Sequence, residues 1–176
     1  MKKITEQTIT EQSVIDWFKD LEYEYKFGPD IAFNGIMPER KDPNFGDVVL
    51  VERLKRALIR INQGLPEEAI ETAINKLLSF SHPNLEIANR EIYRMLTEGV
   101  KVEFKEKGGK RKGDLVKVFD FQNYLNNEFL VVNQFTVRGK ERMRRPDVVV
   151  FINGIPIAVF ELKNPTIEEA TIKSAF

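Results

Sequence analysis

The chain has 176 residues, of which 42% are hydrophobic and 31% charged, a composition typical of one globular domain able to bury a core. It contains no cysteine, which excludes disulfide frameworks, thiolate zinc sites and cysteine nucleophiles and fits a reducing, cytoplasmic compartment. The formal net charge is zero and no run approaches the roughly eighteen apolar residues of a membrane span, so the composition indicates neither a membrane protein nor a uniformly basic nucleic-acid binder.

Apolar side chains recur at helical spacing through most of the first half of the chain. They predict helices over residues 11–20, over residues 48–62, from Pro66 onward, and from Asn84 or Asn89 to Leu96. Thr10 is a typical N-cap for the first of these helices, and Gly99 is a typical stop for the last. A short strand is predicted at residues 23–27.

From Val100 onward the pattern changes to the alternation and β-branched runs of strands. Strands are predicted near residues 100–106, 114–121, 128–138, 147–152 and 156–163. Thr166 is a typical cap for one further helix. Helices first and a sheet later indicate an α+β fold rather than repeating βαβ units.

The segment from Arg145 to Lys163 carries the strongest chemical signal. It reads as two apolar strands around an Asn-Gly turn, with Asp147, Glu161 and Lys163 near their open ends. Charged groups beside an apolar hairpin are costly unless something pairs them. Two carboxylates can share a divalent cation and a lysine can orient or deprotonate a water, so the three residues predict a metal-dependent phosphodiesterase site. The alternative is a surface hairpin with a solvated acid and a Glu/Lys pair.

Strand parity sets a condition on this site. A two-residue turn at Asn153-Gly154 would put Asp147 on the face opposite to Glu161. A three-residue loop over residues 152–154 next to a bulge would instead place Asp147 opposite Val159 and diagonal to Glu161, roughly 7–8 Å away between backbones. We therefore expect an odd-length loop or a bulge, and a regular two-residue turn without a bulge would contradict a shared metal.

A basic run leads directly into Pro146-Asp147. Its members are Arg138, Lys140, Arg142, Arg144 and Arg145. A basic loop at the mouth of an acidic site draws a phosphodiester towards carboxylates that otherwise repel it, so we interpret the run as DNA-binding, with a solvated loop as the alternative. A second run, at residues 105–117, is interrupted by acids and glycines and predicts a hairpin tip.

Further motifs share the order and spacing of a known family. They are Arg-Ile-Asn62, the Asn89-Arg90 helix ending in 98–102, Phe119-Asp120-Phe121, Asn126-Asn127-Glu128-Phe129, Val132-Asn133-Gln134-Phe135, Arg145-Pro-Asp147, residues 153–156 and Glu161-Leu-Lys-Asn-Pro165. Together they resemble the N-terminal nuclease domain of the motor (restriction, R) subunit of type I restriction-modification enzymes, within the PD-(D/E)xK nuclease superfamily. The resemblance implies a single endonuclease domain over residues 1–176 with a restriction-endonuclease-like core, a mixed and mainly antiparallel sheet flanked by helices.

The resemblance also implies a reaction, the Mg²⁺-dependent hydrolysis of double-stranded DNA, in which Mn²⁺ can substitute. Asp147 and Glu161 would bind the cation together with the Leu162 carbonyl, and Lys163 would position or activate the attacking water. Glu11, on the first helix, is a further candidate metal ligand, since nucleases of this superfamily often place an acid there.

Other polar residues have more than one interpretation. Glu11 is also explained as a first-turn acid favoured by the helix dipole, and Glu22 and Glu24 are alternative candidates. Gln134 is expected to touch DNA or to order a metal-bound water. Polar positions without a fixed role, which we expect to satisfy turns and loop backbone, are Asp120, Asn127 and Asn133.

The resemblance implies a larger assembly as well. Subunits of this family carry an ATP-dependent translocase and work with methyltransferase and specificity subunits, so ATP would act only through motor domains absent here, and the chain is expected to be an N-terminal piece. The alternatives are a nuclease-fold module that only binds DNA or a partner subunit, and the stand-alone nuclease of another system. The DNA sequence that is recognised is not predicted.

Overall fold

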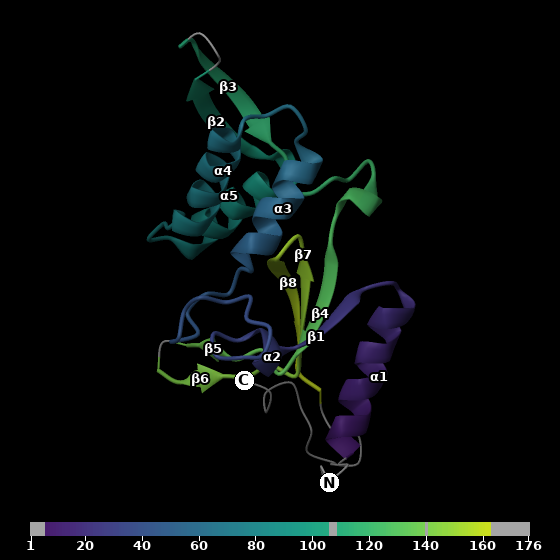
Figure 1. Cartoon of the computed structure of the whole chain (residues 1–176). Helices are drawn as coiled ribbons and strands as arrows, with labels where there is room; N and C mark the ends of the chain where they lie inside the picture. Colours follow the sequence, from purple (N-terminus) through teal and green to yellow (C-terminus); the bar gives the residue numbers. More distant parts are fainter. Residues whose placement is uncertain (1–5, 106–108, 140, 163–176) are drawn as a thin grey trace. The chain divides into compact units, whose positions relative to one another are not determined.

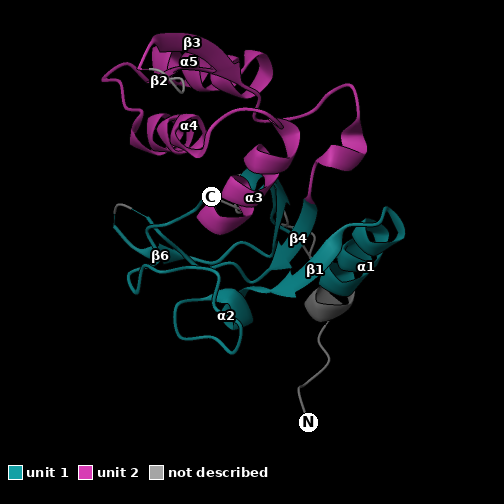
Figure 2. Ribbon diagram, turned by 45° about the horizontal axis from the view of Figure 1, so that its top comes forward, with its two compact units in different colours: residues 1–50, 129–176 teal, residues 51–128 magenta. Residues whose placement is uncertain are grey.

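The structure is a computed structural model that describes residues 6–105, 109–139 and 141–162 (Figure 1). The chain divides into two compact units (Figure 2). Unit 1 combines residues 1–50 with residues 129–176, and unit 2 is the intervening segment Val51–Glu128. Unit 2 is therefore an insertion, in sequence, between the two parts of unit 1.

Unit 1 is built on a four-stranded sheet with the order β1-β4-β7-β8. Its strands are β1 Glu24–Phe27, β4 Phe129–Asn133, β7 Val148–Ile152 and β8 Ile155–Phe160. Strand β1 runs parallel to β4, whereas the β4–β7 and β7–β8 pairs are antiparallel. The sheet is mixed and mainly antiparallel, which confirms the predicted α+β fold.

Apolar side chains leave β4 and β7 on both faces of this sheet. On one face Ile15 of helix α1, Glu6–Asp20, lies in a core cluster with Val131, Val148 and Val150. The other face carries a second cluster, formed by Ile31, Leu50, Leu130, Val132, Phe135, Val149 and Phe151. Successive residues of a strand alternate between faces, so two buried faces require the nearly continuous apolar runs seen in the sequence.

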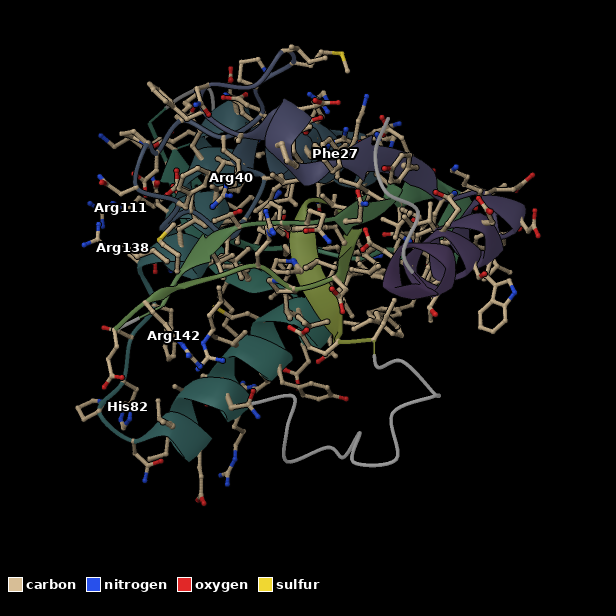
Figure 3. The ribbon with its side chains drawn as sticks, turned by 90° about the horizontal axis from the view of Figure 1, so that it is seen from below. Phe27, Arg40, His82, Arg111, Arg138 and Arg142 are labelled. Carbon is tan, nitrogen blue, oxygen red and sulfur yellow. The ribbon has the colours of Figure 1, made fainter. Side chains whose placement is uncertain are left out.

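Shorter elements of unit 1 lie beside the sheet. They are helix α2, Gly28–Ile31, and the antiparallel pair β5, Val137–Arg138, and β6, Met143–Arg144. Arg40, labelled in Figure 3, is buried and donates to the carbonyls of Thr136 and Asp47 at 2.6 and 2.5 Å. Its guanidinium lies 4.4 Å from the ring centroid of Phe135. These contacts fix the long loop before Leu50 to the chain that follows β4.

Unit 2 packs helices with a hairpin. Its elements are α3 Val51–Ile61, α4 Glu67–Ser79, α5 Leu85–Glu98, β2 Val100–Lys105, β3 Arg111–Val116 and the short 3₁₀ helix η1 Tyr124–Asn126. Asn84 is the N-cap of α5, because its side chain accepts from the N–H groups of Glu86 and Ile87. The buried Asn62 bonds the carbonyl of Leu58 at the end of α3 and both backbone groups of Lys117. The expected hairpin around residues 105–117 is confirmed by the β2–β3 pairing.

Asp120 and Asn127 brace the loop after β3, as expected. The Asp120 carboxylate accepts from the N–H groups of Gln122 and Asn123, each at 3.0 Å, and from the Asn126 side chain at 2.8 Å. Asn127 in turn bonds both backbone groups of Asp120. The hydrogen bond from the Asn123 backbone, followed by that from Asn126, lowers the pKa of Asp120.

Four predicted boundaries are wrong. The strand expected over residues 156–163 ends at Phe160, so Glu161 follows the strand. Helix α1 begins at Glu6, so Thr10 lies inside it and is not its N-cap; the preceding residues include no proline or glycine that would stop a helix. Strand β3 ends at Val116, where the braced loop begins. The strand expected over residues 128–138 is interrupted at Gln134, whose φ of 55° is left-handed and turns the chain.

The helix predicted at Thr166 lies outside the described residues. In the part of the chain that the structure describes, no helix is long and apolar enough to cross a membrane.

Candidate active site

The β7–β8 hairpin combines a two-residue turn with a bulge. Asn153 and Gly154 have φ angles of 52° and 78°, as a type I′ turn requires, and Ile152 pairs with Ile155. The register then shifts, because Phe151 pairs with Pro156 whereas Val150 pairs with Ala158, which leaves Ile157 as the extra residue. The expected three-residue loop is wrong, and the expected bulge is confirmed.

The bulge restores the parity that the candidate site needs. Val149 pairs with Val159 and Val148 with Phe160, so continuing this register by one residue puts Asp147 opposite Glu161. The diagonal arrangement, with Asp147 opposite Val159, is therefore wrong. Such a continuation, one residue beyond β7 and β8, would bring Asp147 and Glu161 to one face of the hairpin, as a shared cation requires.

Asp147 is a buried carboxylate tied to the end of the hairpin. Its side chain is only 7% exposed, and Oδ2 accepts from the backbone N–H of Leu162 at 2.7 Å. Its own carbonyl accepts from the backbone N–H of Gln134 at 3.1 Å. Leu162 is half-buried and Glu161 is exposed. Lys163, the predicted catalytic lysine, lies outside the described residues.

Glu11 lies in a network of side chains at the end of β4. Its Oε1 accepts from Asn133 Nδ2 at 2.5 Å, and its Oε2 accepts from Gln134 Nε2 at 2.9 Å. Tyr25 Oη donates to Asn133 Oδ1 at 3.0 Å. The network joins Asp147 through Gln134, whose backbone bonds the Asp147 carbonyl. The structure thus brings Glu11, Gln134 and Asp147 to one corner of unit 1.

Asn133 has a different role from the backbone-satisfying one expected from the sequence, since it bridges two side chains. Two periodicities combined could have found this contact. Glu11 lies four residues before Ile15 on one helix face, and Asn133 lies two residues after Val131 on one strand face. Ile15 and Val131 pack in the same cluster, so the two polar residues extend that contact.

Burial raises the pKa of the Tyr25 phenol, and the nearby carboxylates of Glu11 and Asp30 raise it further. The phenol therefore stays protonated at neutral pH and donates to Asn133.

The basic residues before Pro146 are exposed on the β5–β6 hairpin of the same unit. Those that the structure describes are Arg138, Arg142, Arg144 and Arg145, the first two being labelled in Figure 3. The backbone N–H of Arg138 donates to the Phe45 carbonyl at 2.9 Å, and Gly139 donates to the Arg142 carbonyl at 2.9 Å. These bonds anchor the hairpin. Lys140 lies outside the described residues.

The donor atoms near Asp147 fit a hard cation such as Mg²⁺. Residues 6–105, 109–139 and 141–162 contain no group of three or more His, Cys, Asp or Glu side chains placed to hold a metal ion. Carboxylates such as those of Asp147 and Glu161, and backbone carbonyls such as that of Leu162, are oxygen ligands of the kind that Mg²⁺ binds. The Leu162 N–H fixes the orientation of one Asp147 oxygen.

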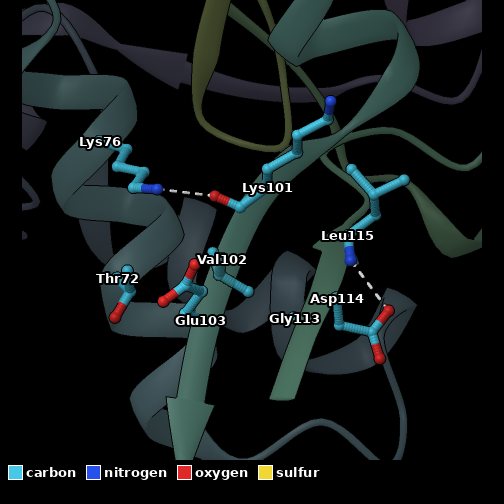
Figure 4. A pocket seen from close by; sticks show the side chains of 8 residues that line it. All are labelled: Thr72, Lys76, Lys101, Val102, Glu103, Gly113, Asp114 and Leu115. Atoms are coloured by element: carbon cyan, nitrogen blue, oxygen red, sulfur yellow. Dashed lines mark hydrogen bonds between the residues drawn. The ribbon is translucent and has the colours of Figure 1, made fainter. Parts of the chain in front are cut away.

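A cavity of about 630 Å³ lies in unit 2, against α4 and the β2–β3 hairpin (Figure 4). It is lined by Thr72, Lys76, Lys101, Val102, Glu103, Gly113, Asp114 and Leu115. Lys76 Nζ donates to the Lys101 carbonyl at 2.8 Å, and the Asp114 carboxylate accepts from the Leu115 N–H at 2.8 Å. None of the sequence-predicted site residues lines this cavity.

Known proteins match the chain along almost its whole length. Residues 3–176 match the family described as type I restriction enzyme R protein N terminus. A putative type I restriction enzyme MjaIXP endonuclease subunit of Methanocaldococcus jannaschii is 40% identical over 178 residues, which cover 99% of this chain and 16% of that protein. The type I restriction enzyme HindI endonuclease subunit of Haemophilus influenzae is 35% identical over 167 residues, with 94% and 16% covered. The chain thus spans 16% of the length of each of these relatives.

Proposed function

The chain belongs to the family of type I restriction enzyme R protein N termini, and from that premise we propose that it is a nuclease that hydrolyses phosphodiester bonds of double-stranded DNA. The observation that carries the proposal is the hydrogen bond from Leu162 to the buried Asp147 carboxylate across a bulged hairpin. It brings an aspartate to Leu162, which directly follows Glu161, and this supports the proposal that Asp147, Glu161 and Lys163 form a PD-(D/E)xK site.

The catalytic roles follow from the donor atoms. Asp147, Glu161 and the Leu162 carbonyl would hold Mg²⁺, or Mn²⁺ in its place, which supplies Lewis-acid stabilisation of the phosphate and lowers the pKa of a bound water. Asp147 suits this role because burial and the Leu162 N–H fix its orientation. Lys163 would position the attacking water and stabilise the charge that develops on the phosphate.

The β5–β6 hairpin supplies the DNA-binding surface in this proposal. Its arginines are exposed and lie in the same unit as Asp147, and Arg145 is only two residues from it. Guanidinium groups attract the phosphate backbone without reading sequence. Base specificity would then come from elsewhere in the restriction complex.

The wider assembly is part of the proposal because the matched relatives are about six times longer than this chain. ATP would act only through motor domains outside the chain. Methyltransferase and specificity subunits would supply DNA modification and sequence recognition.

Calorimetric titration with Mg²⁺ and Mn²⁺ tests the site directly. We expect the wild-type chain to bind, and Asp147→Ala and Glu161→Ala to lose binding while circular dichroism shows that both remain folded. Asp16→Asn is the matched control, because Asp16 is exposed on α1 and its carboxylate bonds only surface side chains. A wild-type chain that binds neither ion would favour a module that only binds DNA or a partner subunit.

A further inference from the structure

We propose that Glu11 and Asn133 form a positioning pair that fixes Gln134 and, through it, Asp147, and that Glu11 is not itself a ligand of the metal ion. The expected effect on cation affinity rests on the proposed function. The hydrogen-bonded pairing of Glu11 and Asn133 rests on the geometry alone.

The orientation of the Asn133 amide is set by its two partners. A carboxylate is only an acceptor, so the Asn133 NH₂ group has to face Glu11. The carbonyl oxygen of the amide then faces Tyr25, which donates to it. Glu11, Asn133 and Tyr25 therefore form a chain of bonds with one consistent direction, and it joins α1, β4 and β1.

Gln134 is the residue that this chain of bonds constrains. Its φ of 55° is left-handed, a conformation that residues other than glycine adopt only when the surroundings enforce it. Its side chain is held by Glu11, and its backbone N–H reaches the Asp147 carbonyl. On the other side, a Cβ at Gly28 would lie 2.5 Å from the Gln134 carbonyl oxygen, so α2 closes the same corner.

The hydrogen bonds of Glu11 support a positioning role. Each of its oxygens already accepts a hydrogen bond from an amide. Among the described residues, no group of three or more His, Cys, Asp or Glu side chains is placed to hold a metal ion, so Glu11 does not stand in such a group with Asp147 and Glu161. A buried carboxylate anchored by amides is the geometry of a structural anchor.

An exchange of the two groups tests this pairing. Glu11→Gln alone would keep an acceptor for one of the two amide donors, Asn133 or Gln134, and set its NH₂ group against the other, and Asn133→Asp alone would set one carboxylate against another. The double variant Glu11→Gln/Asn133→Asp restores every donor–acceptor pair. The amide at position 11 then donates to the carboxylate at 133 and accepts from Gln134, and that carboxylate also accepts from Tyr25.

The first readout is backbone amide exchange measured by NMR on the metal-free chain. Each single variant should speed the exchange of the Gln134 amide by at least about tenfold, and the double variant should return it towards the wild-type rate. The Leu50 amide, which bonds the Gly154 carbonyl at the far end of the hairpin, is the internal control. The pairing would be overturned if the Gln134 amide exchanged at the wild-type rate in the single variants. It would also be overturned if this amide exchanged as fast in the double variant as in the single variants. If a single variant fails to fold, refolding of the double variant supports it.

The second readout is Mn²⁺ affinity. If Glu11 only positions, Glu11→Gln should weaken binding about tenfold, and the double variant should recover it to within about twofold. A loss as complete as that of Asp147→Ala, without recovery, would make Glu11 a ligand and overturn the inference. A wild-type chain that binds no Mn²⁺ would contradict the proposed cation, and the amide exchange rates would still decide the pairing.

Discussion

The backbone N–H of Leu162 donates to Oδ2 of Asp147 at 2.7 Å, although fifteen positions of sequence separate the two residues. One side chain thereby fixes the place where the hairpin ends. Because Asp147 is buried and Leu162 directly follows Glu161, any movement of the second strand changes the position of both acids together.

Replacing Asp147 in two ways separates its charge from its hydrogen bond. Asp147→Asn keeps an oxygen for Leu162, so the thermal unfolding temperature should stay near that of the wild type while cation binding is lost. Asp147→Ala also leaves the Leu162 N–H unpaired, which should cost about 1–3 kcal/mol and lower the melting temperature by several degrees. Circular dichroism melts with parallel calorimetry measure both effects. Equal destabilisation by the two variants would show that the hydrogen bond contributes nothing.

The extra residue at Ile157 is predicted to matter because it shifts the strand register, and not because of its side chain. Ile157 is 46% exposed, so Ile157→Thr should change the stability by less than about 0.5 kcal/mol and leave the Mn²⁺ affinity unchanged. Deleting the residue should rotate every later side chain to the other face, which removes Glu161 from the site and Phe160 from its contact with Phe18. Calorimetry on both variants checks this, and a deletion variant with wild-type Mn²⁺ affinity would contradict the register argument.

Gly28 is predicted to be required because the backbone of residues 133 and 134 passes too close for a side chain at this position. A Cβ there would lie 2.5 and 2.7 Å from the carbonyl oxygens of Gln134 and Asn133, atoms that cannot move without shifting β4. Gly28→Ala should therefore destabilise the chain by about 1–3 kcal/mol in urea unfolding and also weaken Mn²⁺ binding. Gly113→Ala is the matched control, because its nearest neighbour would lie 3.9 Å away, and it should change the stability little. Similar unfolding midpoints for the two variants would argue against the tight corner.

Much of the fold could be predicted from the sequence because its signals are local. Helical spacing indicates α3, α4 and α5, alternation indicates β2, and apolar β-branched runs indicate β7 and β8. The Asn153-Gly154 pair indicated the turn. Strand parity adds a further constraint, because a shared site on Asp147 and Glu161 requires a bulge or an odd-length loop.

The remaining features depend on tertiary contacts. Pro156, which cannot donate to a strand ladder, indicates an irregularity just after the turn, but the place of the bulge at Ile157 also depends on how Ala158 and Phe160 pack against the core. The left-handed turn at Gln134 interrupts a run that reads as a continuous strand, because Glu11 and Asp147 hold it from two distant segments. The place of Lys163 stays a prediction.

Tyr25 is predicted to make stability fall at alkaline pH. Its pKa in the folded chain is raised above the ordinary 10.0 by burial and by Glu11 and Asp30, so the unfolded chain loses this proton first as pH rises. Stability is then fully present below about pH 10 and falls above it. Lys19 Nζ lies 4.8 Å from the Tyr25 ring centroid, a contact that depends on the aromatic ring. Tyr25→Phe keeps the aromatic ring and removes only the hydroxyl group.

Melting temperatures between about pH 8 and 11 should therefore fall less steeply in Tyr25→Phe than in the wild type. Tyr124→Phe removes an exposed phenol and should retain the wild-type slope. If the melting temperatures of Tyr25→Phe and the wild type fall with the same slope at alkaline pH, the effect does not come from the Tyr25 hydroxyl.

The arginines of the β5–β6 hairpin are predicted to contact DNA phosphates. Each phosphate contact releases condensed counterions, so Arg138→Ala and Arg142→Ala should each weaken duplex binding and reduce the salt dependence, d log K/d log[salt], by about one. Fluorescence anisotropy with a labelled duplex in chelator-containing buffer measures this without cleavage. Arg94→Ala is the control, because Arg94 is also an exposed arginine. It lies on α5 and pairs with Glu91 and Glu98. If Arg94→Ala lowers the slope as much as Arg142→Ala does, the attraction is a general effect of net charge, and the hairpin is not the DNA-binding surface.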